Sequence, residues 1–386
     1  MNKTAMDLQR RVLALIGRGV DVTTTDAEFN ELAQTVFAFQ FAHNAVYRAY
    51  CEQLKLTPST VSHWKEIPAV PTSAFKDFTI TCFSAAEAVA VFHTSGTTAD
   101  KSGKHFFKTL ELYEAAIRPN FEAHLLPDLV GQASRLSMLE HATLDGRDAR
   151  STFQRMPMLV LTPSPEEAPH SSLVHMMGRV VADFGAPGSG FYVERGTLCV
   201  EWLVRALRKA EQTRQPVFLL GTAFAFVHLF DHLAGKNLRF KLPDGSRVME
   251  TGGFKGRTRE MSKPDLYALF ERWLGIPTAR VVNEYGMTEL STQFYDQTLR
   301  VGNQTDRKAV PPWARVLIID PRTGQEAVRG ERGLIRIFDL ASLWSAMCIQ
   351  TEDLGVARDD GFEILGRAAG AEVRGCSLNA EAFQTR

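Results

Sequence analysis

The amino-terminal part of the chain has the spacing of hydrophobic residues that is typical of amphipathic helices. Apolar side chains recur three or four positions apart, and neither glycine nor proline interrupts residues 27–56. The clearest run is Phe29, Leu32, Val36, Phe37 and Phe41. Residues 67–75 carry two prolines and predict extended backbone, and the mostly apolar residues 88–93 predict a strand that ends in a loop of small residues. We therefore expect helices first and strands after them.

The middle of the chain alternates between strand and helix patterns. The predicted strands are residues 216–222, 246–253 and 279–286. The predicted helices are residues 201–212, 225–235 and 262–275. The last helix has Ser262 as its cap, Pro264 in its first turn and Gly275 just past its end. This alternation predicts an α/β layer with a parallel sheet, in which ligands bind at the carboxyl ends of the strands.

After Pro311 the pattern changes to short strands separated by turns. The expected strands are residues 314–320, 333–340 and 361–366, with a turn at 321–324. Short alternating strands joined by turns favour an antiparallel meander. The sequence thus predicts a parallel α/β core followed by a smaller antiparallel region.

Composition narrows the function classes. The 386 residues carry equal numbers of basic and acidic side chains, and a chain without a basic excess is a poor candidate for binding nucleic acid through phosphates. The longest apolar run, residues 217–230, is shorter than the roughly 20 residues that cross a bilayer. The amino terminus resembles a first helix more than an export signal. The five cysteines stand singly, which fits neither a disulfide framework nor a zinc site and favours the cytoplasm.

Three loops carry candidate chemistry, and the first is residues 93–104. It follows a predicted strand and is rich in hydroxyl groups, glycine and lysine, which bind phosphate oxygens. It is not a Walker loop, because Gly103-Lys104 is followed by His105 and position 98 is threonine. The alternative is an ordinary surface turn. The candidate nucleotide-binding residues are Thr94, Ser95, Gly96, Thr97, Thr98 and Lys104, with Lys101 as a candidate catalytic cation.

The second loop is residues 283–289, Asn-Glu-Tyr-Gly-Met-Thr-Glu, directly after a predicted buried strand. Tyr285 offers a ring face for a base, Thr288 a hydroxyl for a phosphate, and Glu289 a hard oxygen ligand for Mg²⁺. Asn283, Glu284 and Gly286 complete the candidate site. Taken alone, this stretch is also compatible with an ordinary loop beside a core tyrosine.

The third loop is residues 351–355, Thr-Glu-Asp-Leu-Gly, read as a turn and followed by Gly366-Arg367. The Asp353 carboxylate can accept hydrogen bonds from both ribose hydroxyls, and Arg367 can neutralise a phosphate. An Asp-Leu-Gly turn is common and specifies little by itself.

Together and in this order, the three loops resemble the adenylate-forming superfamily of acyl-CoA synthetases, luciferases and peptide-synthetase adenylation domains. The matching residues are Ser95-Gly96-Thr97-Thr98 with a downstream lysine, then residues 285–289, then residues 351–353 followed by Gly366-Arg367. The resemblance implies the large amino-terminal domain of that fold, with a Rossmann-like α/β core and a small distorted β-barrel. It also implies ATP and Mg²⁺ as cofactors.

Within that superfamily the chain resembles the LuxE-type acyl-protein synthetases, the ligases of bacterial fatty acid reductase systems. The likeness covers nearly the whole chain. It rests on residues 67–76, 95–102, 163–176, 249–257 (which include Gly252 and Gly253) and 366–378. It implies that a carboxylic acid, with a fatty acid as the expected substrate, is activated to acyl-AMP and that the acyl group is passed to a protein thiol. Cys376 is then the candidate acyl carrier, and an acyl-CoA-reductase-like (LuxC-type) protein is the candidate partner.

The chain also departs from the superfamily pattern. Most members have a further carboxyl-terminal domain with a lysine that assists adenylation, whereas this sequence stops about twenty residues after Gly366. We therefore expect one catalytic domain over residues 1–365 and a short tail, residues 366–386, that takes the place of the missing or vestigial second domain. Two alternatives stay open. One is a phenylacetate–CoA-ligase-like enzyme that acylates CoA or a carrier protein, and the other is a non-catalytic fold that binds nucleotide or a partner.

Two further groups have simpler interpretations. His228 and His232 lie four positions apart on a predicted helix, a spacing that can bind metal, but no third ligand is evident in the sequence. Phe224, Phe226 and Phe230 could line an acyl pocket or be ordinary core residues.

Overall fold

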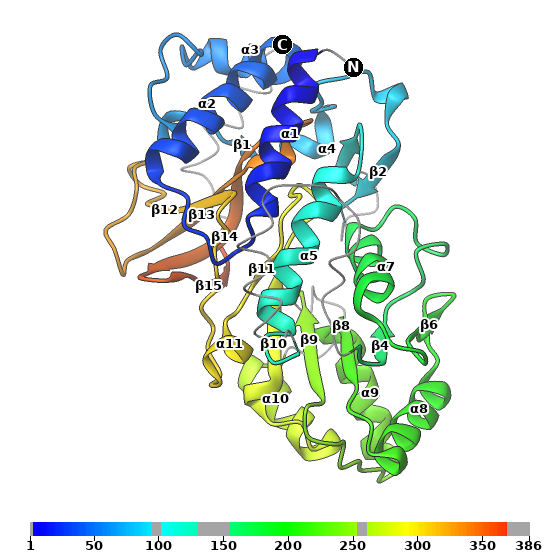
Figure 1. Cartoon of the computed structure of the whole chain (residues 1–386). Helices are drawn as coiled ribbons and strands as arrows, with labels where there is room; N and C mark the ends of the chain where they lie inside the picture. The colour runs from blue at the N-terminus through cyan, green and yellow to red at the C-terminus, as the bar shows by residue number, and fades with distance from the viewer. Residues whose placement is uncertain (1–2, 95–101, 130–154, 253–260, 369–386) are drawn as a thin grey trace. The chain divides into compact units, whose positions relative to one another are not determined.

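The computed structural model describes residues 3–94, 102–129, 155–252 and 261–368 (Figure 1). The chain divides into two compact units. Unit 1 comprises Met1–Pro119, Met287–Phe294 and Arg307–Arg386, and unit 2 comprises Asn120–Gly286 and Tyr295–Asp306. The unit boundaries differ from the domain boundary expected at residue 365, and residues 369–386 of the expected tail lie outside the described residues. The proposed division into a catalytic domain and a tail therefore stays a prediction.

Unit 1 begins with three helices, as the hydrophobic spacing predicted. They are α1 (Lys3–Gly17), α2 (Asp26–His43) and α3 (Ala45–Gln53). Phe29, Leu32, Val36 and Phe37 are buried on α2, and Thr25 caps that helix by accepting a hydrogen bond from the Glu28 N–H at 3.2 Å. Short elements follow: η1 (Trp64–Glu66), β1 (Val70–Pro71), α4 (Ala74–Asp77), η2 (Ala85–Glu87), β2 (Ala90–His93) and β3 (Lys104–Phe107).

The main sheet of unit 1 has the order β1-β14-β13-β12, with β15 also paired to β14. Its later strands are β12 (Ala314–Ile319), β13 (Arg332–Asp339), β14 (Cys348–Arg358) and β15 (Gly361–Arg367), with η4 (Leu340–Ser342) after β13. The pairs β12–β13, β13–β14 and β14–β15 are antiparallel, which confirms the expected meander. Strand β14 was not anticipated. Residues 351–355 lie inside it, so the expected turn there was wrong.

The sheet of unit 2 is the predicted parallel sheet. Its order is β11-β10-β9-β8-β4-β5, and the pairs from β10 to β5 are parallel. The strands are β4 (Met158–Leu161), β5 (Gly190–Phe191), β8 (Phe218–Thr222), β9 (Arg247–Thr251), β10 (Val281–Tyr285) and β11 (Phe294–Tyr295). Every residue of β4 and β9 is buried, as expected for a sheet that is covered on both faces.

Helices cover this sheet on both faces. Helices α8 (Val200–Thr213), α9 (Ala223–Gly235) and α10 (Lys263–Leu274) share one apolar cluster with Leu219 and Val248. Phe218 points to the opposite face and stacks on Phe121 at 5.7 Å, and Phe121 in turn stacks on Phe184 of α7 (Ser172–Phe184). Phe121 lies near the end of α5 (Glu111–Leu125). The small elements β6 (Val193–Glu194), β7 (Thr197–Leu198), η3 (Thr278–Arg280) and α11 (Thr298–Val301) complete unit 2.

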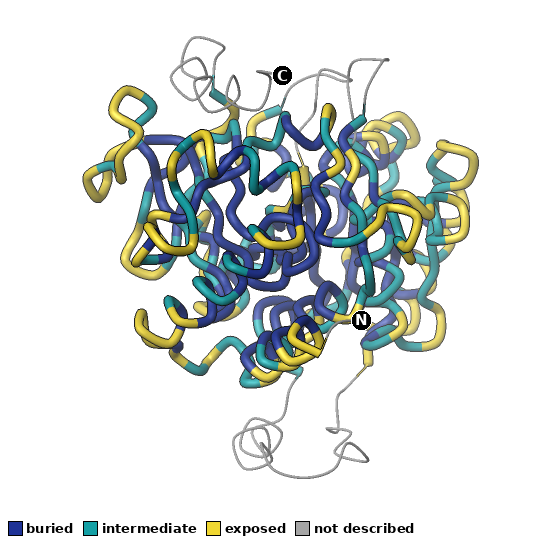
Figure 2. The backbone as a smooth tube through the Cα atoms, turned by 90° about the horizontal axis from the view of Figure 1, so that it is seen from above, coloured by how far each residue is buried: buried dark blue, intermediate teal, exposed yellow. Residues whose placement is uncertain are grey.

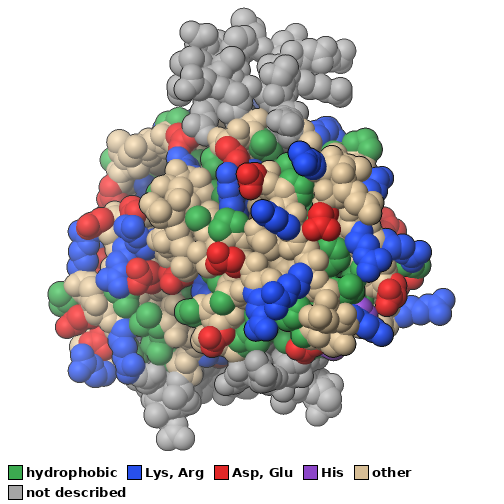
Figure 3. Space-filling view, turned by 90° about the horizontal axis from the view of Figure 1, so that it is seen from below, with side chains coloured by type: hydrophobic (Ala, Val, Ile, Leu, Met, Phe, Trp, Pro, Cys, Tyr) green, Lys and Arg blue, Asp and Glu red, His purple; other side chains and the backbone are tan. Residues whose placement is uncertain are grey.

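The predicted ends of α10 are confirmed. The Ser262 hydroxyl accepts a hydrogen bond from the Asp265 N–H at 3.2 Å, and Gly275 follows the helix with φ +69°. That left-handed conformation suits glycine because it has no Cβ. Exposed residues, yellow in Figure 2, lie mostly in turns and on outer helix faces, whereas the strands of both sheets are largely buried. Acidic and basic side chains are interspersed on the face drawn in Figure 3.

Candidate active site

The hydroxyl-rich loop of unit 1 starts and ends at one point. Strands β2 and β3 pair antiparallel, with His93 opposite Lys104. Just beyond them the Thr94 N–H donates to the Gly103 carbonyl at 2.9 Å, and the Gly103 N–H donates to Thr94 Oγ1 at 2.8 Å. A Cβ on Gly103 would lie only 3.1 Å from Thr94 Cγ2, so this closure favours glycine. Ser95, Gly96, Thr97, Thr98 and Lys101 lie outside the described residues, and their phosphate contacts stay predictions.

His105 is a site residue that the sequence reasoning missed. Its side chain lies on β3 between the rings of Phe75 and Phe107 and is 2% exposed. Its Nδ1 lies 2.8 Å from the Thr288 carbonyl oxygen, which can only accept, so Nδ1 carries the proton. Burial lowers the pKa of His105 to about 4, while the hydrogen bond to Thr288 opposes that shift. The ring is therefore neutral near pH 7. Its neighbour Lys104 is exposed.

Thr288 joins the first two predicted loops within unit 1. Its Oγ1 donates to the His93 carbonyl at 3.3 Å, while its own carbonyl accepts from His105. The hairpin β2–β3 is thus bonded to both the side-chain hydroxyl and the backbone carbonyl of Thr288. Glu289 follows directly and is 7% exposed. The structure therefore brings the hairpin β2–β3 and Thr288, which precedes Glu289, together, although they are distant in sequence.

A buried carboxylate anchors the chain just after Glu289. Asp339, at the end of β13, is fully buried and accepts from the Ser291 N–H and from Thr292 Oγ1, both at 2.8 Å. The Ala341 N–H and Ser342 Oγ donate to the same carboxylate at 3.0 and 3.2 Å. Burial raises the pKa of Asp339, and these four hydrogen bonds oppose the rise. The sequence offered one signal for this role, a single acidic residue inside the mostly apolar stretch 337–344.

The residues of the third predicted loop lie in strand β14, which pairs with β15. The two proposed nucleotide-binding residues, Asp353 and Arg367, are neighbours across this pair of strands. Asp353 on β14 lies opposite Arg367 on β15, and Arg367 Nε is 3.6 Å from Asp353 Oδ1. The Arg367 side chain is 77% exposed. The register shifts between Leu354 and Gly355, where a Cβ would come within 2.7 Å of the Glu363 carbonyl. The glycine thus allows the bulge beside Asp353, a feature common next to functional sites.

The remaining predicted residues lie in unit 2, at the carboxyl ends of β9 and β10. Thr251 Oγ1 donates to the Glu284 carboxylate, and Asn283 Nδ2 donates to Glu250 Oε1 at 2.7 Å. Asn283 and Glu284, both predicted to bind nucleotide, thus also tie neighbouring strands together. Tyr267 OH donates to the same Glu250 oxygen at 3.0 Å, and burial followed by the nearby Glu250 charge raises the pKa of Tyr267.

The strand ends themselves are more open. Gly252 is exposed with φ +75°, Gly286 is exposed, and Tyr285, the last residue of β10, is half-buried. These three positions have the accessibility that a base-binding surface needs. Gly253 lies outside the described residues.

Three of the four described cysteines are unsuited to nucleophilic chemistry. Cys51, Cys82 and Cys348 are buried, and burial raises the pKa of each thiol, to about 12 for Cys51 and Cys348. The thiolate is the nucleophilic form, so these thiols are inert near neutral pH. Cys199 is half-buried at the start of α8. Cys376 lies outside the described residues.

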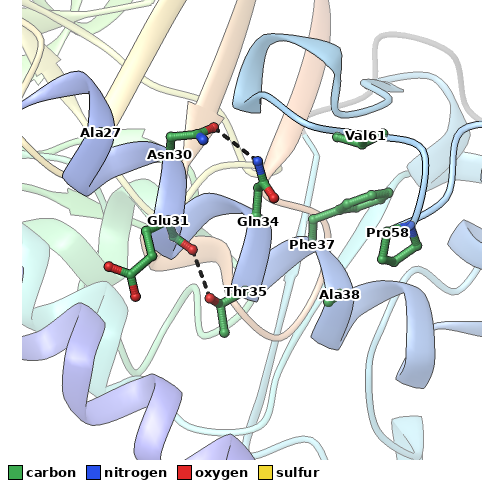
Figure 4. Close-up of a pocket in the computed structure, with 9 residues that line it drawn as sticks. All are labelled: Ala27, Asn30, Glu31, Gln34, Thr35, Phe37, Ala38, Pro58 and Val61. Carbon is green, nitrogen blue, oxygen red and sulfur yellow. Dashed lines mark hydrogen bonds between the residues drawn. The ribbon is translucent and has the colours of Figure 1, made fainter.

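Three other candidate sites in the described ranges do not show features of a nucleotide, metal or acyl site. A surface hollow of about 620 Å³ beside α2 is lined by that helix and by Pro58 and Val61 (Figure 4). Two hydrogen bonds join polar groups of its lining, from Thr35 Oγ1 to the Glu31 carbonyl and from Gln34 Nε2 to Asn30 Oδ1. Among the described residues no set of three or more His, Cys, Asp or Glu side chains could hold a metal, which includes His228 and His232. Phe226 and Phe230 pack on Phe270 as core residues.

No helix in the described ranges is long and apolar enough to cross a membrane.

Comparison with known proteins decides the family. The family model of the LuxE acyl-protein synthetases matches residues 150–383, more than half of the chain. The chain belongs to the LuxE family. It is similar to two proteins named long-chain-fatty-acid–luciferin-component ligase. The one from Aliivibrio fischeri is 23% identical over 361 residues, covering 91% of this chain and 87% of that relative. The one from Vibrio harveyi is 21% identical over 367 residues, covering 92% and 88%. This LuxE chain is accordingly an acid–thiol ligase.

Solved structures show the fold of this LuxE protein. A crystal structure of 2-hydroxyisobutyryl-CoA ligase in complex with 2-HIB-AMP and CoA has a TM-score of 0.61 at 14% identity, covering 91% of this chain and 71% of that chain. Another, in the postadenylation state with R3-HIB-AMP, has a TM-score of 0.62 at 13% identity, covering 94% and 74%. The expected adenylate-forming fold is confirmed.

Proposed function

We propose that this LuxE protein uses ATP to convert a fatty acid to its acyl-adenylate, releases pyrophosphate, and then transfers the acyl group to a cysteine of a protein. Family membership and the names of the two relatives support an acyl-protein ligase with a long-chain fatty acid as substrate. The acyl-AMP in the related ligase structures supports an adenylate as intermediate. The observation that carries the proposal is the pair of hydrogen bonds that join the hairpin β2–β3, which flanks the 94–103 loop, to Thr288, the residue before Glu289.

In the first step a carboxylate oxygen of the acid attacks the α-phosphorus of ATP. The bond from the α-phosphorus to the bridging oxygen breaks, and pyrophosphate leaves with that electron pair. The loop 94–103 would supply hydroxyl and backbone N–H donors to phosphate oxygens, and Lys104 an exposed positive charge. Asp353 would accept from the ribose hydroxyls, and Arg367 would neutralise a phosphate beside it.

Glu289 is the residue that would hold Mg²⁺. A single protein carboxylate fits this ion, because Mg²⁺ is usually bound through one or two carboxylates together with substrate phosphates. The ion would neutralise charge that develops on the phosphates. Glu289 is largely buried in a segment that is anchored on both sides, so its carboxylate is held in place.

In the second step a thiolate attacks the acyl carbon, a thioester bond forms and AMP leaves with the electrons of the broken acyl–phosphate bond. Cys376 is the proposed acyl carrier. The inertness of Cys51, Cys82 and Cys348 supports this choice by removing three rivals. A LuxC-type reductase is the proposed final acceptor. Transfer to free CoA is the alternative acceptor chemistry, and the CoA in a related ligase structure favours testing it.

The test of adenylation is acid-dependent exchange of labelled pyrophosphate into ATP with a panel of short-, medium- and long-chain fatty acids. We expect AMP and pyrophosphate as products, with long-chain acids preferred. Glu289→Gln should lower the exchange rate by about 10²-fold or more, since it removes a charge that acts on the developing phosphate charge. Formation of ADP and phosphate, or a near-normal rate in Glu289→Gln, would contradict the proposal.

The test of transfer is mass spectrometry after incubation with ATP and a fatty acid but without any partner. We expect an acyl thioester on Cys376 that is absent in Cys376→Ser, while pyrophosphate exchange persists. Cys199→Ser is the matched control, because Cys199 is the only half-buried thiol among the described residues. Efficient acylation of added CoA by Cys376→Ser would instead establish direct transfer to an external thiol.

A further inference from the structure

The segment that carries Glu289 is held at both of its ends by side chains from other parts of unit 1. At its start, the Thr288 carbonyl accepts from His105 Nδ1 at 2.8 Å. At its end, the Ser291 N–H and Thr292 hydroxyl donate to Asp339, each at 2.8 Å. Glu289 lies between these two anchors in the sequence. The backbone on each side of Glu289 is thus fixed by a side chain that is itself buried.

We propose that His105 and Asp339 are positioning residues for the adenylation reaction, which together fix the backbone of residues 288–292 and so the place of the Glu289 carboxylate. The inference rests on the proposed function of Glu289. It goes beyond that function because it assigns roles to two residues that would touch neither substrate nor metal.

The Asp339 anchor depends on a carboxylate. All four of its partners are donors: the Ser291 and Ala341 N–H groups and the Thr292 and Ser342 hydroxyls. Trp313 Nε1 also donates to Thr292 Oγ1 at 3.0 Å, which directs the Thr292 hydrogen toward Asp339. An asparagine has the same shape but turns one oxygen into an NH₂ group. That group would face a backbone N–H at either Ser291 or Ala341, so one anchor would be lost whichever way the amide points.

The His105 anchor depends on a donor at the Nδ1 position. The Thr288 carbonyl oxygen can only accept a hydrogen bond, and the leucine side chain has no donor. His105→Leu would therefore leave this carbonyl without its partner from β3. Asparagine places its NH₂ group close to where Nδ1 lies and should keep the hydrogen bond. His105→Leu and His105→Asn therefore separate loss of the donor from loss of the imidazole ring.

The kinetic arm measures pyrophosphate exchange with hexadecanoic acid in the full chain. Because small misplacements of reacting groups cost up to about 10²-fold, we expect Asp339→Asn to lower the turnover number by about 10-fold or more, with KM for ATP and acid changed by less than about 3-fold. His105→Leu should lose about 10-fold and His105→Asn should recover to within about 3-fold of wild type. In a Glu289→Gln background, Asp339→Asn should cost less than about 3-fold further, because residues that act through one group are not additive.

The structural arm is independent of activity. We expect hydrogen exchange to accelerate by about 10-fold or more in Asp339→Asn at the Ser291 amide or at the Ala341 amide, because whichever N–H faces the asparagine NH₂ group loses its buried acceptor. Asp128→Asn is the control for general destabilisation: it removes a carboxylate that binds the buried Arg247 in unit 2, and it should leave Ser291 exchange and turnover unchanged.

Two results would overturn the inference. One is an equal loss from Asp339→Asn in the wild-type and Glu289→Gln backgrounds, and the other is unchanged exchange at both the Ser291 and the Ala341 amides in Asp339→Asn. Failure of the proposed function has a different signature, because the wild-type protein would then show no acid-dependent exchange. In that case the hydrogen-exchange arm still decides whether the anchor at Ser291 exists.

Discussion

Acidification should destabilise this protein through His105. Burial lowers the pKa of His105 to about 4, below its ordinary value of 6.5 in an unfolded chain. The unfolded state therefore binds more protons between pH 6.5 and 4, so the stability that the neutral ring allows is fully present above pH 6.5 and is lost as the pH falls toward 4. The shift predicts a total loss of about 3 kcal/mol, since one pKa unit corresponds to about 1.4 kcal/mol. Between pH 7.5 and 5 the expected loss is about 2 kcal/mol.

The assay is urea unfolding at pH 7.5 and pH 5, followed by tryptophan fluorescence, with wild type and His105→Asn compared at each pH. The asparagine cannot titrate but keeps a donor for the Thr288 carbonyl. The two proteins are identical at every other position, so the contributions of all other residues cancel in the comparison. We expect the acid-induced loss of unfolding free energy to be about 2 kcal/mol smaller in His105→Asn than in wild type.

Equal acid-induced losses in the two proteins would refute the reasoning. They would mean that His105 binds its proton as readily in the folded protein as in the unfolded one, which is incompatible with a ring buried between Phe75 and Phe107. A larger loss in His105→Asn would have the same meaning, because the variant has nothing to protonate at this position.

Two further predictions concern the nucleotide-binding elements. Asp353→Ala should raise KM for ATP by about 10-fold while the turnover number changes by less than about 3-fold, because a ribose contact is alike in the ground state and the transition state; unchanged ATP affinity in calorimetry with a reduced turnover would contradict this role. Gly103→Ala should slow pyrophosphate exchange by about 10-fold, because its Cβ crowds Thr94 and opens the base of the loop. Gly235→Ala, where a Cβ meets nothing within 4 Å, is the matched control, and equal rates in the two variants would show that the closure at Thr94 is unimportant.

The parts of the fold that the sequence predicted are those encoded by local periodicity. Apolar spacing found α2, the alternation of β8, α9, β9, α10 and β10, and the ends of α10. Strand β14 was missed because Glu352, Asp353 and Gly355 interrupt its apolar pattern with residues that favour turns. Its place between β13 and β15 is set by pairing partners elsewhere in the chain, which local spacing does not encode.

The candidate site shows the same division. The loop residues were found because their types match phosphate and metal chemistry at strand ends. His105 and Asp339 were missed because their roles arise only from tertiary contacts, and His105 lies 183 positions from Thr288. Asn283 and Glu284 were noticed for their polarity, yet their bonds to Glu250 and Thr251 could not be inferred without the register of β9 and β10.

The discontinuous construction of unit 1 has a consequence for how the protein is made. Strand β1 pairs with β14, Val70 opposite Ile349, whereas most of unit 2 is one continuous stretch, Asn120–Gly286. On the ribosome, the sheet from β4 to β10 can therefore assemble before strand β14 has been synthesised. During that time strand β1 lacks its pairing partner, and helices α1–α3 lack the later part of unit 1. Long-range strand pairing is slow, and unpaired apolar surface is prone to aggregate. We expect newly made chains to depend on chaperones during this interval, and substitutions in β14 to lower the yield of folded protein.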